Sequence, residues 1–385
     1  MEIVLPFSQF IFCNQTIDVT IVIVNKHKAF RGYYCMIYNS KLWNKDIDTV
    51  IEVLPELEEI AGKSIMITGA AGLICSSVVD ILFRYNDTHE KKIQILAAGR
   101  WLEEMTARFG EYVNRPDFTF VVYDASKTDN KIIEKADYIL HGASNASPNM
   151  ILKEPVETML SNFLGIKYLL DYARDSGTRR ILYISSSEVY GAKDGNEPYK
   201  EGEYGYIDLL KSRNSYSIGK CAAETMCVSY ADEYSVESVI VRPGHIYGPT
   251  ASPHDVRVGS AWAYAVAKGE DIVMKSDGSQ IRSYVYSLDC ASAMLKVLLL
   301  GENCHAYNIS NPDSIITIKE LGELLAKAGG VELKVELPTE EERKGFNPMS
   351  NSSLEAKSLL DLGWKGCFNA ETGLNHTVEI LKEII

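Results

Sequence analysis

The sequence lacks an excess of positive charge. Its 385 residues contain 39 Lys and Arg against 52 Asp and Glu, which gives a formal net charge of −13. A general nucleic-acid binder needs a surplus of cations to meet phosphates, so this balance argues against nucleic acid as a partner. A small anionic ligand needs only a few local donors and stays open.

The sequence also lacks the closely spaced cysteine pairs of a disulfide framework or a zinc site. The eight cysteines are scattered at positions 13, 35, 75, 221, 227, 290, 304 and 367. We therefore expect buried or idle thiols in a reducing compartment, and no bound metal.

No stretch is typical of a leader or a membrane anchor. The apolar run from Met1 to Phe12 has neither a basic region before it nor a small-residue cleavage site, and Asn14 and Asp18 interrupt the sequence soon after it. We expect a cytoplasmic protein without a membrane partner. Repeats and low-complexity segments are absent as well.

From Lys63 onward, short apolar strands alternate with segments of helix length. The predicted strands are Ser64–Thr68, Ile93–Ala98, Phe118–Val122, Tyr138–His141, Arg180–Ser185 and Ser238–Arg242. The helical segments between them include Ser76–Tyr85, Val156–Ser176 and Tyr216–Tyr234. Continuous apolar strands in such an alternation predict a doubly wound α/β fold, with a parallel sheet covered on both faces and ligands at the carboxyl ends of the strands.

The alternation also divides the chain. Residues 1–62 form an N-terminal extension of unknown role, with a predicted strand at Thr16–Val24 and an acidic helix at Asp46–Ile60. Residues 63–243 form the α/β domain. After Pro243 the alternation loosens, which indicates a smaller substrate-binding lobe over 244–385, interleaved with the last strands of the sheet.

The first predicted strand runs into the turn GAAGLIC and then into a helix. Gly69 and Gly72 fall where a tight turn and a close approach to a pyrophosphate are needed, and the start of the helix supplies free N–H groups. The third position of this fingerprint is Cys75, whose side chain is small enough to be tolerated. We expect a dinucleotide to contact Gly69, Ala71, Gly72, Leu73 and Ile74.

The second strand ends in LAAGR and has no carboxylate at its end. NAD users normally carry an acidic residue there for the ribose 2′-hydroxyl. Arg100 suits a 2′-phosphate instead, which leaves NADP open beside NAD; stacking on adenine or facing water are equal alternatives for this side chain. Asp124, after the third strand, is placed to meet the adenine.

Tyr216 and Lys220 are four residues apart on one helical face. An ammonium group beside a phenol lowers the pKa of the phenol, so that tyrosine can act as a base near neutral pH. Ser186 lies in the SSSEVYG segment after the fifth strand, and its hydroxyl could hold the substrate oxygen that Tyr216 deprotonates.

With these residues in view, the chain from about 63 to 380 resembles the extended short-chain dehydrogenase/reductase family of nucleotide-sugar epimerases and dehydratases. The resemblance rests on ordered motifs: the glycine turn, HGASNASP (141–148), SSSEVYG (185–191), YSIGK (216–220), RPGHIYGP (242–249) and GSQIRSYVYSLD (278–289).

The resemblance implies a Rossmann-type sheet, a bound NAD and a homodimer formed through two helices. It also implies that Ser186, Tyr216 and Lys220 are a catalytic triad, and that a nicotinamide takes a hydride from C4 of a sugar. Arg282 matches an arginine that contacts the nucleotide diphosphate. In the HGASNASP motif, Ala143 is expected at the cofactor and Ser144 at the substrate.

The residues at 186–188 bear on the reaction. In this family 4,6-dehydratases carry an Asp-Glu pair there, and simple 4-epimerases usually lack both carboxylates. Ser186-Ser187-Glu188 is similar to the Thr-Ser-Glu of UDP-glucuronate decarboxylases, which implies a catalytic Glu188 and a substrate contact from Ser187. HDVRV (254–258), which contains Arg257, is similar to their NDGRV, so Arg257 is expected at the substrate.

Decarboxylation of UDP-glucuronate to UDP-xylose is therefore the main prediction. His245 stands at or near an asparagine that contacts substrate in the family, and is either a ligand contact or a satisfied loop histidine. The alternatives are a nucleotide-sugar 4-epimerase, a 4,6-dehydratase with altered acid chemistry, and a non-catalytic NAD(P)-binding sensor.

Overall fold

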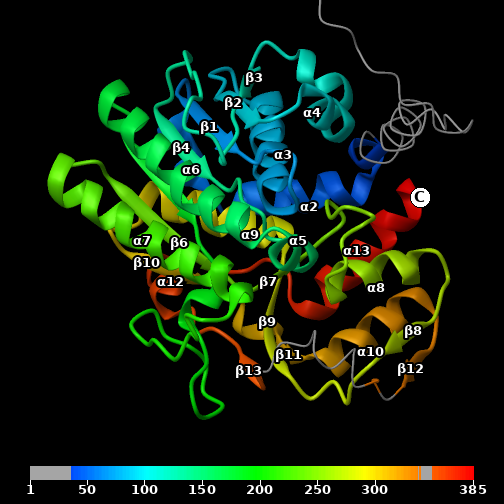
Figure 1. Cartoon of the computed structure of the whole chain (residues 1–385). Coiled ribbons are helices and arrows are strands. Elements are labelled where there is room, and N and C mark those ends of the chain that lie inside the picture. Colours follow the sequence, from blue (N-terminus) through cyan, green and yellow to red (C-terminus); the bar gives the residue numbers. More distant parts are fainter. Residues whose placement is uncertain (1–35, 337, 340–348) are drawn as a thin grey trace, which may run out of the picture.

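The computed structural model describes residues 36–336, 338–339 and 349–385. At its centre is a seven-stranded sheet with helices on both sides (Figure 1). Its strands are β1 (Ser64–Thr68), β2 (Gln94–Gly99), β3 (Phe118–Val122), β4 (Tyr138–His141), β5 (Arg180–Ile184), β6 (Ser238–Pro243) and β10 (Ala306–Ile309). Six of the seven are predicted from the sequence, and β1, β3 and β4 have the predicted bounds.

The sheet is parallel throughout, with the strand order β10-β6-β5-β4-β1-β2-β3. The chain builds outward from β1 through β2 to β3, then returns to the other side of β1 for β4, β5 and β6. The order therefore reverses between β1 and β4, where a doubly wound sheet opens a crevice at the carboxyl ends of its strands. The predicted fold class is confirmed.

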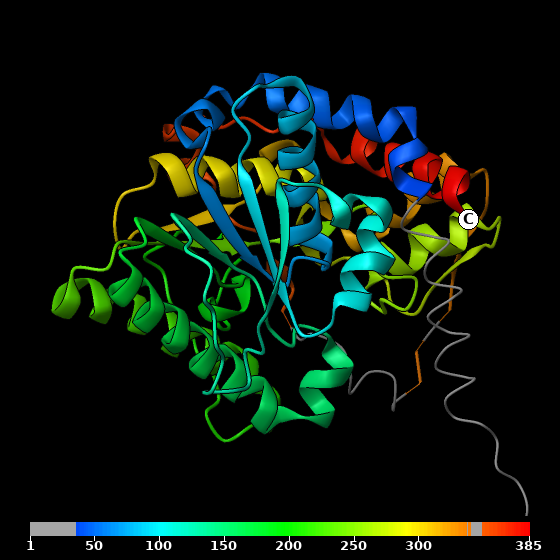
Figure 2. The ribbon, with the colours of Figure 1, turned by 90° about the horizontal axis from the view of Figure 1, so that it is seen from above.

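Helices lie on both faces of the sheet. The helices are α2 (Lys41–Glu52), α3 (Leu73–Thr88), α4 (Leu102–Phe109), α5 (Pro148–Lys153), α6 (Pro155–Ser176), α7 (Ser215–Tyr234), α8 (Val258–Ala267), α9 (Ser287–Leu300), α10 (Ile318–Gly329), α12 (Lys357–Asp361) and α13 (Ala370–Ile384). Figure 2 shows α6 and α7 on one side of the sheet and α3, α9 and α2 on the other.

The alternation of side chains along β1 explains these two layers. Ile65 and Ile67 belong to the apolar core that includes α3 and α9, whereas Met66 belongs to a second core with Ile166 of α6 and Ala223 of α7. Successive side chains of a strand point to opposite faces, so a strand covered on both sides must be apolar at every position.

The acidic helix predicted at Asp46–Ile60 is placed incorrectly. The structure has α2 over Lys41–Glu52, followed by a 3-10 helix over Pro55–Ile60. Ser40 begins α2, because its hydroxyl accepts a hydrogen bond from the Trp43 amide at 3.2 Å. Pro55 cannot continue an α-helix but suits the first position of a new one. The strand predicted at Thr16–Val24 lies outside the described residues.

The described part of the extension packs onto the rest of the chain. Asp46 of α2 is buried and accepts hydrogen bonds from Tyr286 Oη (3.1 Å) and His376 Nδ1 (3.0 Å). These partners belong to β9 (Ile281–Tyr286) and α13. Through these bonds α2 packs against the C-terminal region of the chain.

The remaining strands form small sheets in the C-terminal region. They are β7 (His245–Tyr247), β8 (Ile272–Met274), β9, β11 (Ile315–Thr317), β12 (Leu333–Val335) and β13 (Asn351–Ser352). β9 pairs with β7, β11 and β13, and β8 with β12. From the same region, α9 covers the central sheet and β10 extends it. The domain boundaries at 63–243 and 244–385 stay a prediction.

Candidate active site

The turn after β1 has the geometry of a pyrophosphate cradle. Gly69 has a φ of +68°, and a Cβ added there would lie 3.1 Å from the backbone of Gly142 and Ala143. Only glycine therefore lets the β1 turn approach the end of β4 so closely. At the start of α3, Gly72 provides no side-chain cap, so the first amides of the helix remain for an anion. These features fit a bound dinucleotide.

Cys75 at the third fingerprint position is accommodated by a glycine on another strand. The thiol is buried against the segment after β4, and a Cβ at Gly142 would overlap with Cys75 Sγ. The space that the fingerprint normally gains from glycine in the helix is supplied here by Gly142.

Arg100 follows β2 and is exposed, whereas Asp124 lies two residues beyond β3 and is partly buried. Burial raises the pKa of Asp124, but hydrogen bonds from Ser126 and the charge of Arg100 outweigh it and keep the pKa below its usual value. The two side chains are therefore near each other. Asp124 Oδ1 accepts hydrogen bonds from the Ser126 amide at 3.0 Å and from the Ser126 hydroxyl at 2.7 Å. These bonds hold the loop after β3.

The three predicted catalytic side chains meet beyond the end of β5. Lys220 Nζ donates to the carbonyl oxygen of Ile184 at 2.7 Å and lies 5.7 Å from the centre of the Tyr216 ring. Ser186 begins the 3-10 helix Ser187–Tyr190, where its hydroxyl accepts from the Glu188 amide at 3.2 Å. Tyr216 and Lys220 come from the first two turns of α7.

The predicted lowering of the Tyr216 pKa by Lys220 is wrong for this structure. Burial, with the charge of Glu188, raises the pKa of Tyr216 to about 12. A hydrogen bond with Ser186 is the largest opposing influence. Burial also lowers the pKa of Lys220 to about 7, so the lysine is only partly charged at neutral pH.

Arg213 is part of the site although the sequence did not indicate it. Its Nη1 and Nη2 lie 2.5 Å and 2.8 Å from Oε2 and Oε1 of Glu188, and Ser217 Oγ donates to Oε2 at 3.0 Å. The one available signal is its position three residues before Tyr216, in the short 3-10 helix that leads into α7.

On the substrate side, β7 and β9 bring His245 and Arg282 toward the catalytic residues. His245 pairs in register with Tyr284, and its ring centre lies 5.6 Å from that of the tyrosine. Burial and the charge of Arg282 lower the pKa of His245 to about 4, so its ring is neutral at pH 7. The charge of Glu188 also acts on His245, which places the histidine near the catalytic carboxylate.

Arg282 is a buried cation with only neutral partners among the described residues. It donates to the carbonyl oxygens of Ile281 (2.8 Å) and Met349 (2.9 Å), and no described carboxylate pairs with it. A buried guanidinium without a counter-ion favours an anionic ligand. Arg257 is instead held by Asp255, with the shortest contact at 2.5 Å, and its charge acts on Tyr216.

The remaining predicted contact, Ser144, donates to Asn162 Oδ1 at 2.9 Å, and Ser187 is partly exposed beside Glu188. Ser186, Glu188, Tyr216 and Lys220 are thus gathered at one end of β5. Within the described residues, no cluster of His, Cys, Asp or Glu suits a metal ion. Nor does any described helix have the length and apolar character to span a bilayer.

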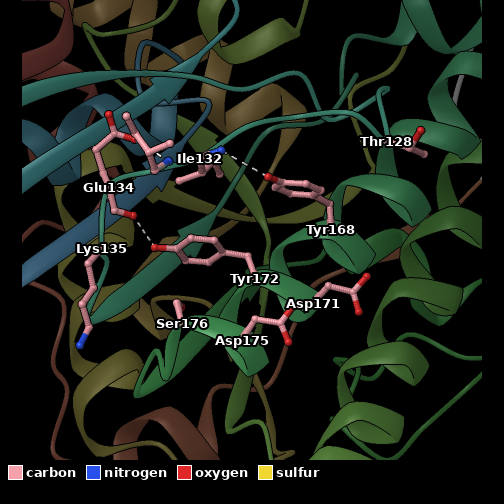
Figure 3. Close-up of a pocket in the computed structure, with 10 residues that line it drawn as sticks. Thr128, Ile132, Glu134, Lys135, Tyr168, Asp171, Tyr172, Asp175 and Ser176 are labelled. Atoms are coloured by element: carbon pink, nitrogen blue, oxygen red, sulfur yellow. Dashed lines mark hydrogen bonds between the residues drawn. The ribbon is translucent and has the colours of Figure 1, made fainter.

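The hollow in Figure 3 is separate from this site. It has a volume of about 640 Å³ and lies beside the C-terminal half of α6. Tyr168 Oη donates to the carbonyl oxygen of Asn130 at 2.8 Å, and Tyr172 Oη to that of Glu134 at 2.6 Å. Both tyrosines fasten the segment before β4 to α6, and none of the predicted site residues lines the hollow.

Comparison with known proteins decides the family. The model of the NAD dependent epimerase/dehydratase family matches residues 65–310, which include the glycine turn and the catalytic cluster. The chain belongs to this family. The predictions of the family, of an enzyme and of NAD as cofactor are thereby confirmed.

Two relatives of this chain are named for one particular reaction of the family. UDP-glucuronic acid decarboxylase 1 of Xenopus tropicalis is 28% identical over 330 residues, covering 85% of this chain and 74% of that protein. UDP-glucuronic acid decarboxylase 5 of Arabidopsis thaliana is 29% identical over 312 residues, covering 80% and 86%. Both alignments extend beyond the family match and include most of the chain.

A solved structure shares the fold of this family member. The UDP-glucuronic acid 4-epimerase of Bacillus cereus, solved with UDP-glucuronic acid and NAD, superposes with a TM-score of 0.70 at 19% identity. The match covers 84% of this chain and all of that one.

Proposed function

We propose that the protein uses NAD to oxidise C4 of UDP-glucuronate transiently, releases carbon dioxide and forms UDP-xylose. The observation that carries this proposal is the pair Ser187-Glu188. Only one of the two positions used by dehydratases holds a carboxylate, and Arg213 fixes it in place. The names of the two relatives described above agree with this reaction.

The cofactor would lie across the crevice between β1 and β4. The residues that would hold it are Gly69, Ala71, Gly72, Leu73, Ile74, Arg100, Asp124, Ala143, Tyr216 and Lys220. Bound there, NAD would supply the acceptor for the C4 hydride, the donor of that hydride later in the cycle, and a positive charge on its oxidised ring.

Tyr216 is the proposed base for the C4 hydroxyl. Ser186 donates a hydrogen bond that holds the substrate oxygen, and Tyr216, ionised to the phenolate, accepts the hydroxyl proton as the hydride leaves C4. The positive charge of a bound nicotinamide would oppose the burial that raises the pKa of Tyr216 to about 12. Lys220 holds the helix against β5 through its bond to the Ile184 carbonyl oxygen, and burial lowers its pKa to about 7.

Carbon dioxide then leaves without a separate acid. Once C4 is a ketone, the C6 carboxylate is β to it, and the electrons of the C5–C6 bond move into an enolate as carbon dioxide departs. Water supplies the proton that C5 takes up, after which the hydride returns to C4 and the C4 oxygen regains the proton from Tyr216. A dehydratase must instead protonate a departing hydroxyl, for which Ser187 supplies no carboxyl group. Glu188 assists at the carboxylated end of the sugar.

Arg282 is the proposed contact for the diphosphate. It is buried, it has no carboxylate partner among the described residues, and its charge acts on His245. Arg257, His245, Ser144 and Ser187 would complete the sugar and phosphate contacts. His245 Nδ1 is shielded from water and has no hydrogen-bond partner among the described residues, which favours a ligand contact.

A product assay tests this function. Purified protein is incubated with UDP-glucuronate, UDP-glucose and dTDP-glucose, and the products are identified by mass and by anomeric NMR signals. The proposal expects loss of carbon dioxide from UDP-glucuronate alone. Loss of water from a neutral hexose nucleotide would establish the dehydratase alternative. An isomer of unchanged mass would establish the epimerase alternative. No turnover of any of the three would favour the non-catalytic sensor.

We also propose a homodimer through α6 and its neighbour α7. Val156, Met159, Leu160 and Phe163 recur at helical spacing on α6 and are 63%, 41%, 43% and 38% exposed. Such a contiguous apolar face is typical of an interface. Sedimentation of Leu160→Glu tests it, with Ile133→Glu, which is 90% exposed elsewhere, as the control. A wild-type monomer would contradict the proposal.

A further inference from the structure

Both oxygens of the Glu188 carboxylate are occupied by groups in the first turn of α7 and in the 3-10 helix just before it. Arg213 contacts one oxygen through each terminal nitrogen, at 2.5 Å and 2.8 Å, and Ser217 donates to Oε2 at 3.0 Å. A guanidinium that meets a carboxylate with two parallel bonds fixes its plane as well as its position. The side chains of Arg213 and Glu188 are 40% and 28% exposed, so the pair borders solvent.

This ion pair joins the two elements that carry the proposed chemistry. Glu188 belongs to the 3-10 helix that begins directly after Ser186. Arg213 belongs to the 3-10 helix Ser212–Asn214, which leads without interruption into α7 and Tyr216. Arg213 is therefore placed to set the distance between the Ser186 turn and the Tyr216 helix.

The pair also balances charge at Tyr216. The Glu188 carboxylate raises the pKa of Tyr216, and the Arg213 guanidinium lowers it. Without the arginine, an uncompensated carboxylate would face the phenol and the carboxylate of the proposed substrate. A carboxylate close to the phenol disfavours ionisation of the phenol, and it also disfavours binding of an anionic substrate.

We propose that Arg213 is a positioning residue that acts through Glu188, holding its carboxylate oriented toward the sugar. The proposal rests on the proposed function for the identity of that sugar. Direct recognition of the substrate carboxylate by Arg213 is the competing role. It is disfavoured because both terminal nitrogens are already engaged with Glu188.

A double-mutant cycle separates these roles. Arg213→Gln, Glu188→Gln and the double variant are compared with wild type by kcat and KM, in enzyme saturated with NAD. We expect Arg213→Gln to lower kcat about tenfold or more while KM stays within about threefold. In the Glu188→Gln background, Arg213→Gln should lower kcat by less than about twofold, because the carboxylate through which Arg213 acts is gone.

Two results would overturn the proposal. The first is a loss of equal size in both backgrounds, and the second is a large rise in KM with unchanged kcat, which would show direct substrate binding. Arg174→Gln is the control, since it removes another arginine paired with a carboxylate at 36% exposure and far from the site. If Arg213→Gln does not fold, Arg213→Lys replaces it, because one ammonium group cannot form the two parallel bonds to Glu188. Arg213→Lys should lower kcat less than Arg213→Gln, and this loss should also disappear in the Glu188→Gln background.

The cycle also distinguishes this inference from the proposed function. It is run on whichever of the three nucleotide sugars the wild type converts. Conversion of UDP-glucose or dTDP-glucose alone would contradict the decarboxylase and leave the coupling of Arg213 to Glu188 measurable. An additive cycle on UDP-glucuronate would contradict only the role of Arg213. A wild type inactive on all three sugars would overturn both.

Discussion

Lys220 Nζ donates a 2.7 Å hydrogen bond to the carbonyl oxygen of Ile184, the last residue of β5. This bond ties α7 to the end of a central strand and thereby sets the place of Tyr216, one turn earlier on the helix. The anchor is buried, with Lys220 only 3% exposed, and burial lowers its pKa to about 7.

Lys220 should therefore make the stability of the fold depend on pH. The unfolded chain binds this proton below a pKa of about 10.4, but the folded protein only below about 7. Between these values folding releases a proton, so the free energy of unfolding falls as the pH falls. Lys220→Met removes this dependence, worth up to about 1.4 kcal/mol per pH unit.

Denaturant unfolding of Lys220→Met and wild type at pH 7, 8, 9 and 10 measures this difference. As the pH falls, the free energy of unfolding of Lys220→Met should rise relative to that of the wild type. Lys211→Met, at an exposed lysine, should show no such change. A difference that is constant over this range would show that Lys220 is not a buried, neutralised amine.

Tyr216→Phe should abolish turnover and leave NAD binding nearly intact. The change removes the proposed base and one oxygen, with little loss of packing, and a drop of about a hundredfold or more is expected for loss of a general base. Turnover and the Kd for NAD are measured together. Tyr234→Phe, at the other end of α7, is the control. A turnover within a few-fold of wild type would contradict the assignment of Tyr216 as the base.

Gly142→Ala should destabilise the protein through Cys75. The new methyl group would overlap with the thiol and would also lie 3.0 Å from Ile184 Cδ1. Overpacking of this kind costs about 1–3 kcal/mol. Adding Cys75→Ala should recover part of the loss in a thermal unfolding experiment. Gly202→Ala, where a Cβ meets nothing within 4 Å, should be nearly neutral. No recovery in the double variant would exclude the proposed contact.

Arg100 should allow NADP to bind about as well as NAD. No carboxylate follows β2, and the exposed guanidinium is free to meet a 2′-phosphate. Calorimetric titration with both cofactors measures the ratio, and Arg100→Gln should weaken NADP selectively. A preference of about a hundredfold for NAD, some 2.7 kcal/mol, would leave Arg100 without a phosphate role.

Ser187→Asp separates decarboxylation from dehydration. In a decarboxylase the new carboxylate repels the substrate carboxylate, so turnover of UDP-glucuronate should fall, while Ser187→Ala should change it little. In a disguised dehydratase the same change restores an acid and should raise loss of water from UDP-glucose. Product masses for both substrates are the measurement, and a gain of dehydration by Ser187→Asp would contradict the decarboxylase.

The sequence predicts the centre of the fold well because its signals there are local. β1, β3 and β4 are short apolar runs covered on both faces, and Gly69 directly ends the first of them. β10 was not predicted, since only part of its sequence, AYNI, is apolar and its place at the sheet edge depends on a long-range pairing with β6. The acidic stretch places the start of α2 too late, because its signals lie earlier: the cap at Ser40 and the buried, helically spaced Trp43, Ile47 and Val50.

The site was predictable in its members but not in its electrostatics. The spacing of Tyr216 and Lys220 shows that they are neighbours, yet it does not show that both are buried, and burial decides their pKa values. Arg213 and Glu188 are 25 residues apart, and the intervening loop that brings them together has no periodic pattern. Contacts of that kind are visible only in the folded chain.

The most direct test of the decarboxylase uses UDP-glucuronate labelled with carbon-13 at C6. Wild-type protein is incubated with this substrate and NAD, with Tyr216→Phe as the blank, and the label is followed by NMR. The account predicts that the label leaves as carbon dioxide and bicarbonate, in equal amount to an unlabelled UDP-pentose. Label that remains in a nucleotide sugar, as an isomer or as untouched substrate, would contradict it.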